Sequence, residues 1–224
     1  MPTPCWVSYV EMVKIAQGKS VLVKTTMDNN FCLTAQQLEE AITPNTKLLM
    51  LCTPNNPTGS VYTYENLKAI VEVLKKHPQI IVLADEIYQH ILYTGKHETL
   101  AQFPELEDRL IIVNGVSKAY AMTGYRIGWL ACHDKDFITA VKRLQGQTIS
   151  CATTIAQKAA EAAYSGPQDC VENMRQAFER RRNLIVGLAK EIPGMKVLEP
   201  QGAFYLFPDV SAFFGKQYNG QTIR

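Results

Sequence analysis

The stretch VNGVSKAYAMTGYRIGW, residues 113–129, shows how the chain is organised. It follows the apolar run at residues 110–113, and it carries Lys118 just after that run and Arg126 eight residues further on. A short apolar run that ends in a polar connection is typical of a buried strand in a parallel sheet. Open α/β sheets bind ligands beyond the carboxyl ends of their strands. The stretch therefore predicts a buried strand followed by a loop with chemistry at the edge of a sheet.

Two earlier segments have the same form. TPNNPTG at residues 53–59 follows the apolar run at 48–52, and ADEIY at residues 84–88 ends the run at 80–84. Taken singly, each has an ordinary explanation: a Pro/Asn turn for the first segment and a capping Asp85 for the second. Taken alone, Lys118 and Arg126 would be interpreted as ordinary surface cations, and Trp6 as an ordinary core tryptophan.

The apolar pattern predicts alternating strands and helices. Strands are expected at residues 21–25, 48–52, 80–84, 110–113 and 127–132. A helix at 64–76 has an apolar face formed by Leu67, Ile70, Val71 and Leu74. A shorter helix at 34–42 begins with Thr34 and Gln37 as a capping box. This alternation predicts an α/β layered fold with a mostly parallel sheet.

From about residue 135 the pattern becomes helical. One helix is expected at 134–147 with Asp134 as its cap, a second at 153–164, and a third at 168–192. At roughly 1.5 Å per residue the third helix is more than about 30 Å long, which predicts a bridge out of the first domain. Its apolar stripe consists of Val171, Met174, Phe178, Ile185 and Leu188. Two further strands are expected at 196–198 and 203–207.

Composition excludes several classes of protein. The chain has 224 residues, a net charge of +2 and 46% apolar residues, which fits a globular protein and gives no electrostatic reason to bind nucleic acid or an anionic membrane. The six cysteines lack C-x-x-C or metal-ligand spacing, so no metal site is expected and a reducing compartment is favoured. No signal peptide and no apolar run of about 20 residues is present, so we expect a cytoplasmic protein.

Together and in this order, the segments resemble the pyridoxal 5'-phosphate (PLP) pocket of the fold-type I aminotransferases, most closely that of the aspartate aminotransferases. The intervals between the six matching positions, from Trp6 to Arg126, are 50, 29, 3, 30 and 8 residues. AMTGYRIGW, the long helix and GAFYLFPDV also look like this family, so the resemblance covers nearly the whole chain.

The resemblance implies a role for each matching residue. Lys118 would hold the cofactor's aldehyde and later move the substrate proton, and Asp85 would keep the pyridine nitrogen protonated. Side chains alternate along a strand, so only one of Asp85 and Glu86 faces the site, and the family's D-x-x-Y pattern selects Asp85 with Tyr88. The remaining cofactor contacts implied are Asn56 and Tyr88 on the phenolic oxygen, Arg126 and Ser117 on the phosphate, and Trp6 on the face of the ring.

The resemblance also implies a domain organisation. Residues 1–167 would form the large PLP-binding domain of three layers without its amino-terminal part, 168–192 a bridging helix, and 193–224 the beginning of a small α+β domain. Family members have further residues at both ends, including the arginine that binds the substrate's α-carboxylate. Many relatives also have a serine three residues before the lysine, where this chain has Gly115. We therefore expect a chain that binds PLP weakly and is weakly active or inactive alone.

The expected function is PLP-dependent transamination between an L-amino acid, aspartate, and the 2-oxo acid 2-oxoglutarate, in a homodimer. Three alternatives stay open. The first is another enzyme on this scaffold, an alanine or aromatic aminotransferase or a C–S lyase. The second is an aminotransferase-like sensor domain of a transcription regulator. The third is a degenerate structural subunit, against which the intact set of Asp85, Lys118 and Arg126 argues.

Overall fold

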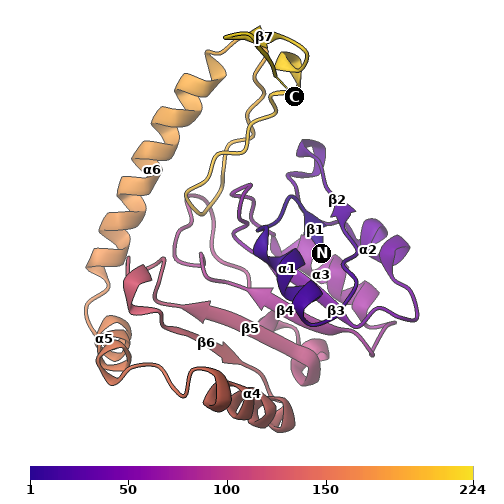
Figure 1. Cartoon of the computed structure of the whole chain (residues 1–224), viewed down its shortest axis with the longest axis vertical. Coiled ribbons are helices and arrows are strands. Elements are labelled where there is room, and N and C mark those ends of the chain that lie inside the picture. The colour runs from indigo at the N-terminus through magenta and orange to yellow at the C-terminus, as the bar shows by residue number, and fades with distance from the viewer. Residues whose placement is uncertain (224) are drawn as a thin grey trace.

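A four-stranded sheet forms the centre of the computed structural model, which describes residues 1–223 (Figure 1). Its strands lie in the order β3 (Leu48–Cys52), β4 (Ile81–Asp85), β5 (Leu110–Gly115) and β6 (Gly128–Ala131). The first three are parallel and β6 runs antiparallel to β5. The expected α/β fold with a mostly parallel sheet is confirmed, and the strand expected at 127–132 is its antiparallel edge.

Helices cover both faces of the sheet, because side chains alternate along each strand. Leu49 and Leu51 of β3 enter the main core, together with side chains of α2 (Ala35–Ala41) and α3 (Tyr64–Leu74). Met50 and Cys52 point to the opposite face and pack with Tyr9 of α1 (Ser8–Ile15). The sheet therefore lies between two helical layers.

The local signals for helix starts are confirmed. The Thr34 hydroxyl accepts a hydrogen bond from Gln37 N, and the Gln37 side-chain oxygen accepts one from Thr34 N. The capping box of α2 is therefore formed. Asp134 caps α4 (Lys135–Thr148) by accepting a 2.8 Å bond from Phe137 N. The predicted apolar face of α3 is buried, with 0 to 1% exposure for Leu67, Ile70, Val71 and Leu74. Helix α1 was not predicted.

The remaining elements are short, except for two helices. α5 spans Thr154–Ser165 and α6 spans Asp169–Lys190. β1 (Pro2–Thr3) pairs with β2 (Val23–Lys24), so only two residues of the strand expected at 21–25 are paired. The other short elements are β7 (Gln217–Tyr218), β8 (Gln221–Thr222) and the 3-10 turns η1 (Met27–Asn29), η2 (Leu100–Gln102), η3 (Pro104–Arg109), η4 (Thr123–Tyr125) and η5 (Ser211–Phe213).

The two strands expected after α6 are wrong. The segment 196–209, here called the return loop, runs back from the far end of α6 towards the sheet and out again (Figure 1). It makes only single antiparallel bridges, Lys196 with Asp209 and Leu92 with Gly202. Its tip lies against loops that offer no continuous strand, so its apolar residues pack without a ladder.

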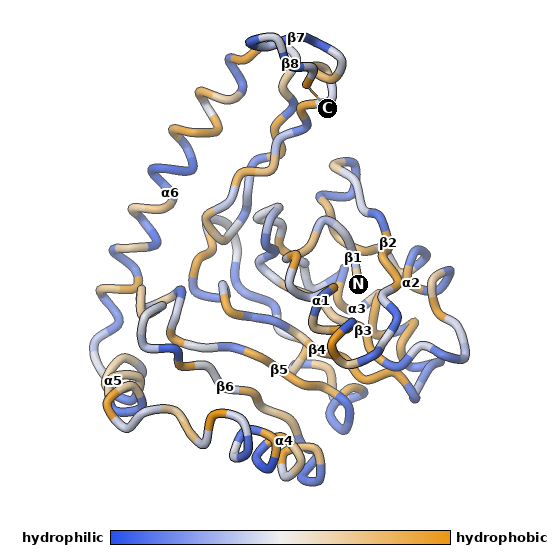
Figure 2. Tube along the Cα trace, in the orientation of Figure 1, coloured by the Kyte–Doolittle hydropathy of each residue, from blue (hydrophilic) through white to orange (hydrophobic). Residues whose placement is uncertain are grey.

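The apolar stripe predicted on α6 is only partly buried. Val171 is buried near the sheet, whereas Ile185 and Leu188 are 50% and 54% exposed. In Figure 2 orange and blue alternate along the whole helix, including the part that extends beyond the sheet. The stripe is therefore wrong as a buried face in its second half, where Val186 and Ala189, 4% and 6% exposed, are buried in place of Ile185 and Leu188.

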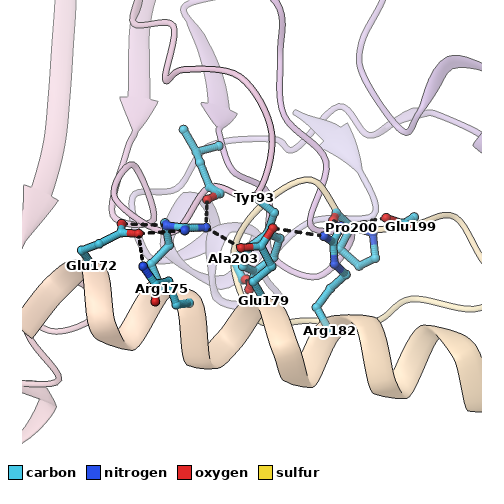
Figure 3. A network of polar contacts seen from close by, with 10 residues as sticks. Tyr93, Glu172, Arg175, Glu179, Arg182, Glu199, Pro200 and Ala203 are labelled. Atoms are coloured by element: carbon cyan, nitrogen blue, oxygen red, sulfur yellow. Dashed lines mark hydrogen bonds and ion pairs between the residues drawn. The ribbon is translucent and has the colours of Figure 1, made fainter.

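Two arginines of α6 attach the helix to the return loop, through an ion pair and a hydrogen bond, and to the loop that follows β4, through a hydrogen bond (Figure 3). Arg175 pairs with Glu172 and Glu179 and donates to the carbonyl of Leu92. Arg182 donates to Glu199 over 3.0 Å and to the carbonyl of Pro200 over 2.9 Å. These bonds hold the return loop between the helix and the sheet.

Within residues 1–223, no helix is both long enough and apolar enough to cross a membrane.

Candidate active site

The strand register brings the candidate residues to one edge of the sheet. Cys52 lies opposite Asp85, and Asp85 lies opposite Val113, so the carboxyl ends of three parallel strands are level. A cavity of about 450 Å³ opens at this edge. The residues singled out from the sequence all line it: Trp6, Asn56, Asp85, Tyr88, Ser117, Lys118 and Arg126.

Asp85 is the acidic group of the cavity. Its carboxylate accepts a 2.5 Å hydrogen bond from the Tyr9 hydroxyl and a 3.1 Å bond from Ile87 N. Burial raises the pKa of Asp85, and these two hydrogen bonds oppose that shift by stabilising the carboxylate. The neighbouring Glu86 is buried outside the cavity and accepts a 2.7 Å bond from Thr99 Oγ1. The structure thus separates the two carboxylates, as strand alternation requires.

Lys118 lies in the connection that follows β5. Its amine is 5.8 Å from the ring centroid of Tyr88 and 5.8 Å from that of Phe204. The two ring centroids are 5.3 Å apart, so both rings lie on the same side of the amine. An amine beside aromatic rings is partly removed from water and attracted by them. The Lys118 amine also lies near enough to Asp85 to lower the pKa of that carboxyl. Lys118 therefore faces the interior of the cavity.

Tyr88 is 3% exposed, and its hydroxyl lies 2.5 Å from the hydroxyl of Tyr205 in the return loop. Burial raises the pKa of Tyr88. Asn56 lies in the turn after β3, where Gly59 N bonds Asn55 O over 2.9 Å. Tyr88 and Asn56 therefore supply neutral polar groups to the cavity.

Arg126 supplies the cation of the cavity. It follows η4 with a left-handed backbone, φ +53°, and donates a 2.8 Å bond to the carbonyl of Thr123. The hydroxyl residues Ser117 and Thr123 line the cavity beside it. Gly115 is accounted for by close packing, because a Cβ there would lie 2.7 Å from the carbonyl oxygen of Ile127. A serine at this position would require the backbones of β5 and β6 to move apart.

Trp6 lies at the start of α1 and is 40% exposed. Its ring meets that of Tyr9 edge to face, with centroids 5.4 Å apart. This placement contradicts its interpretation as an ordinary core tryptophan. The indole lines the cavity, so an aromatic ligand bound there would contact it.

Sequence reasoning missed four side chains of the cavity that carry a hydroxyl or a thiol: Tyr9, Cys52, Thr123 and Tyr205. Tyr9 lies three residues after Trp6, and Thr123 lies three before Arg126, so proximity to a candidate was the available signal. Cys52 was assigned to an apolar strand, and burial raises the pKa of its thiol to about 12, so it stays neutral. Tyr205 was assigned to a strand that does not form.

The donor set defines the ligand that the cavity suits. The cavity contains the Asp85 carboxylate with the Tyr9 hydroxyl. It also contains the Arg126 guanidinium beside two hydroxyl residues, the Lys118 amine and the Trp6 ring. This set matches a flat aromatic ring with a protonated nitrogen, an anionic group and an electrophilic carbon.

Comparison with known proteins identifies the family. Residues 1–217 match the family model described as aminotransferase class I and II. The chain is 50% identical over 211 residues to an aspartate aminotransferase of Geobacillus stearothermophilus, an alignment that covers 93% of this chain and 53% of the relative. The chain therefore belongs to the class I and II aminotransferase family.

Further comparisons confirm the expected similarity to aspartate aminotransferases. An aspartate aminotransferase of Pinus pinaster is 44% identical over 97% of this chain and 45% of its own length. The crystal structure of the aspartate aminotransferase from Rhizobium meliloti superposes with a TM-score of 0.95 at 42% identity, covering 100% of this chain and 56% of that one. The chain thus spans about half the length of the curated relatives that it matches.

Proposed function

We propose that this chain is the cofactor-binding part of a PLP-dependent aminotransferase that moves an amino group between aspartate and 2-oxoglutarate. The observation that carries the proposal is the convergence of Lys118, Asp85 and Arg126, from three separate segments, on one cavity. Aspartate is favoured because the relatives described above are aspartate aminotransferases.

The cavity residues fit PLP, which members of this family use. Asp85 would pair with the pyridine nitrogen, Tyr88 and Asn56 would contact the phenolic oxygen, and Trp6 would stack on the ring. Arg126 and Ser117 would hold the phosphate, since guanidinium and hydroxyl groups bind phosphate oxygens well. When bound, the cofactor supplies an electron sink for the negative charge that develops on the substrate's Cα.

The chain's own groups would move the proton. Lys118 would release its hold on the cofactor, take the proton from the substrate's Cα and deliver it to the cofactor's C4′ carbon as general base and then general acid. The rings of Tyr88 and Phe204 lie side by side next to the amine, each 5.8 Å away at its centroid, and limit its path on that side. Asp85 would keep its charge opposite the ring nitrogen through both transfers, helped by the hydrogen bonds from Tyr9 and Ile87.

The substrate's α-carboxylate needs a further cation. Of the described residues, Arg126 is the one arginine that lines the cavity, and it is assigned to the phosphate. We therefore expect this chain alone to bind PLP weakly and to turn over slowly or not at all. We also propose that residues 1–167 act as the cofactor domain, 168–192 as a bridge and 193–224 as the start of a small domain, and that two copies form the working unit.

A second candidate is transamination of another substrate at the same site. The aromatic aminotransferase structure from Pyrococcus horikoshii superposes with a TM-score of 0.88 at 37% identity, covering 92% of this chain and 56% of that one. A 44%-identical relative from Petunia hybrida is described as acting on prephenate as well as aspartate. Aspartate, tyrosine and prephenate should therefore be compared as substrates in any preparation that shows turnover.

The proposal is tested by reducing a mixture of the chain and PLP with borohydride and mapping the labelled peptide by mass spectrometry. We expect the label at Lys118, and its loss in Lys118→Ala. The matched control Lys142→Ala changes an exposed lysine of α4 and should keep the label. Label spread over many surface lysines in the parent chain would overturn the proposal.

A further inference from the structure

The return loop reaches the cavity through one polar side chain. Tyr205 lines the cavity although it follows Tyr88 by 117 residues, and the two hydroxyl oxygens are 2.5 Å apart. The rings meet nearly at right angles, 81° between planes, with centroids 5.7 Å apart. The adjacent Phe204 faces both Tyr88 and the Lys118 amine. The return loop therefore forms one wall of the site.

Backbone bonds fix this wall in place. The amides of Gln201 and Gly202 both donate to the carbonyl of Gly59 over 2.9 Å, and Ala203 N donates to Ile91 O over 2.8 Å. A Cβ on Gly202 would lie 2.7 Å from the ring of Pro54, so the tip packs directly on the turn that carries Asn56. The bonds tie residues 201–203 to two different segments, the turn at Gly59 and the loop at Ile91, and so fix the backbone directly before Phe204 and Tyr205. The position of Tyr205 is therefore set by the fold.

The proton count determines what this pair can do. Each tyrosine hydroxyl has one proton to donate and lone pairs to accept with. If Tyr88 donates its proton to the cofactor's phenolic oxygen, Tyr88 has none left for Tyr205. The 2.5 Å contact must then be a hydrogen bond donated by Tyr205 and accepted by Tyr88.

We propose that Tyr205 is a positioning residue of the cofactor site, which donates to the Tyr88 hydroxyl and thereby directs the Tyr88 proton to the cofactor's phenolic oxygen. The inference rests on the proposed function and adds a residue to it from the far side of α6. Hydrogen bonds in a chain polarise one another, so Tyr205 makes Tyr88 a stronger donor. A stronger donor withdraws charge from the phenolic oxygen. The Lys118 nitrogen, which would lie beside that oxygen when it holds the cofactor, then loses its proton at a lower pH.

The first test uses the cofactor-free chain and measures unfolding in urea for Tyr88→Phe, Tyr205→Phe and the double variant. A hydroxyl pair contributes about a 2- to 10-fold change in the unfolding equilibrium, and the effects of coupled residues do not add. We expect the double variant to be little worse than either single one. Tyr218→Phe, at a 70% exposed tyrosine of β7, is the control and should match the parent. Additive effects of the two substitutions would overturn the contact.

The second test measures the pH midpoint of the bound cofactor's visible absorption band, together with the dissociation constant for PLP. We expect Tyr205→Phe to raise the midpoint and to weaken binding about 2- to 10-fold. Neither change should occur in a Tyr88→Phe background, because Tyr205 acts through Tyr88. A midpoint that stays unchanged in Tyr205→Phe, or an equal shift in both backgrounds, would overturn the inference.

The two proposals fail in distinguishable ways. If borohydride labelling shows no selective reaction at Lys118, the proposed function fails, and the cofactor role of Tyr205 fails with it. If Lys118 is labelled but the double-variant analysis shows no coupling, only the role of Tyr205 fails.

Discussion

The hydroxyl of Tyr9 donates a 2.5 Å hydrogen bond to the carboxylate of Asp85, across 76 residues of sequence. It joins α1, on one face of the sheet, to the last residue of β4. Burial favours the neutral acid at Asp85, whereas the bond from Tyr9 favours the carboxylate. Only a carboxylate can pair with a protonated ring nitrogen. The balance between these two effects therefore sets the pH range in which Asp85 can hold such a ring.

Replacing Tyr9 with Phe should weaken PLP binding in a pH-dependent way. Loss of the hydroxyl raises the pKa of Asp85 further, so the carboxylate, and with it PLP affinity, is lost at a higher pH as the solution is acidified. We expect about a 10-fold loss of affinity, typical of a hydrogen bond to a charged group. Fluorescence titrations between roughly pH 5 and pH 8 measure this. A variant whose affinity falls by the same factor at every pH would contradict the role assigned to Tyr9, and Tyr218→Phe serves as the control.

Asp85→Asn should stabilise the free chain while it abolishes tight PLP binding. The folded-state pKa of Asp85 is raised, so ionising it costs stability as pH rises from its unfolded value, about 3.9, through the folded one. The amide carries no such cost. We expect Asp85→Asn to gain stability over the parent chain at pH 7 and to lose that advantage near pH 4. Urea unfolding at both values measures it, with the exposed Asp108→Asn as the control. A gain of the same size at both pH values would show that burial of charge is not its cause.

Arg126→Gln should separate PLP from pyridoxal, which lacks the phosphate. Position 126 has a left-handed backbone, φ +53°, which costs Gln about as much as Arg because both carry a Cβ. The fold should therefore tolerate the change. Loss of a charge-assisted hydrogen bond, about 1.5 to 3 kcal/mol, predicts at least about a 10-fold weaker affinity for PLP and little change for pyridoxal. Equilibrium binding of both ligands tests this, with the exposed Arg143→Gln as the control. Equal losses for the two ligands would remove Arg126 from the phosphate site.

Arg182→Met should loosen the return loop. Arg182 is 9% exposed, binds Glu199 and the Pro200 carbonyl, and lies 4.8 Å from the Tyr93 ring centroid. Met keeps much of the packing but leaves the Pro200 carbonyl unpaired, a loss of about 1 to 3 kcal/mol in the free energy of unfolding. We expect faster proteolysis within residues 196–209 and a lower urea midpoint. Arg180→Met changes an exposed neighbour on the same helix, and similar behaviour of the two variants would contradict a specific role for Arg182.

Much of the fold was predictable because its signals are local. The capping pairs of α2 and the buried face of α3 depend on residues three or four apart, and both are found as expected. The strands after α6 were predicted on the same kind of evidence and do not form. A strand needs a partner, and residues 196–209 meet loops rather than a free strand edge. In the second half of α6 the buried residues are Val186 and Ala189, each one position after a residue of the predicted stripe, because the return loop decides which side of the helix is covered.

The sequence by itself determined which residues could carry the chemistry. Asp85 and Tyr88 lie three residues apart, and Lys118 and Arg126 lie eight apart, so each pair could be recognised in a single segment. Only the tertiary structure decided how these groups are held. Tyr9 and Tyr205 reach their partners through the strand register and through the return of the chain after α6. Hydrogen bonds between such distant residues leave no periodic pattern in the sequence, because they depend on how whole elements pack and not on local backbone geometry.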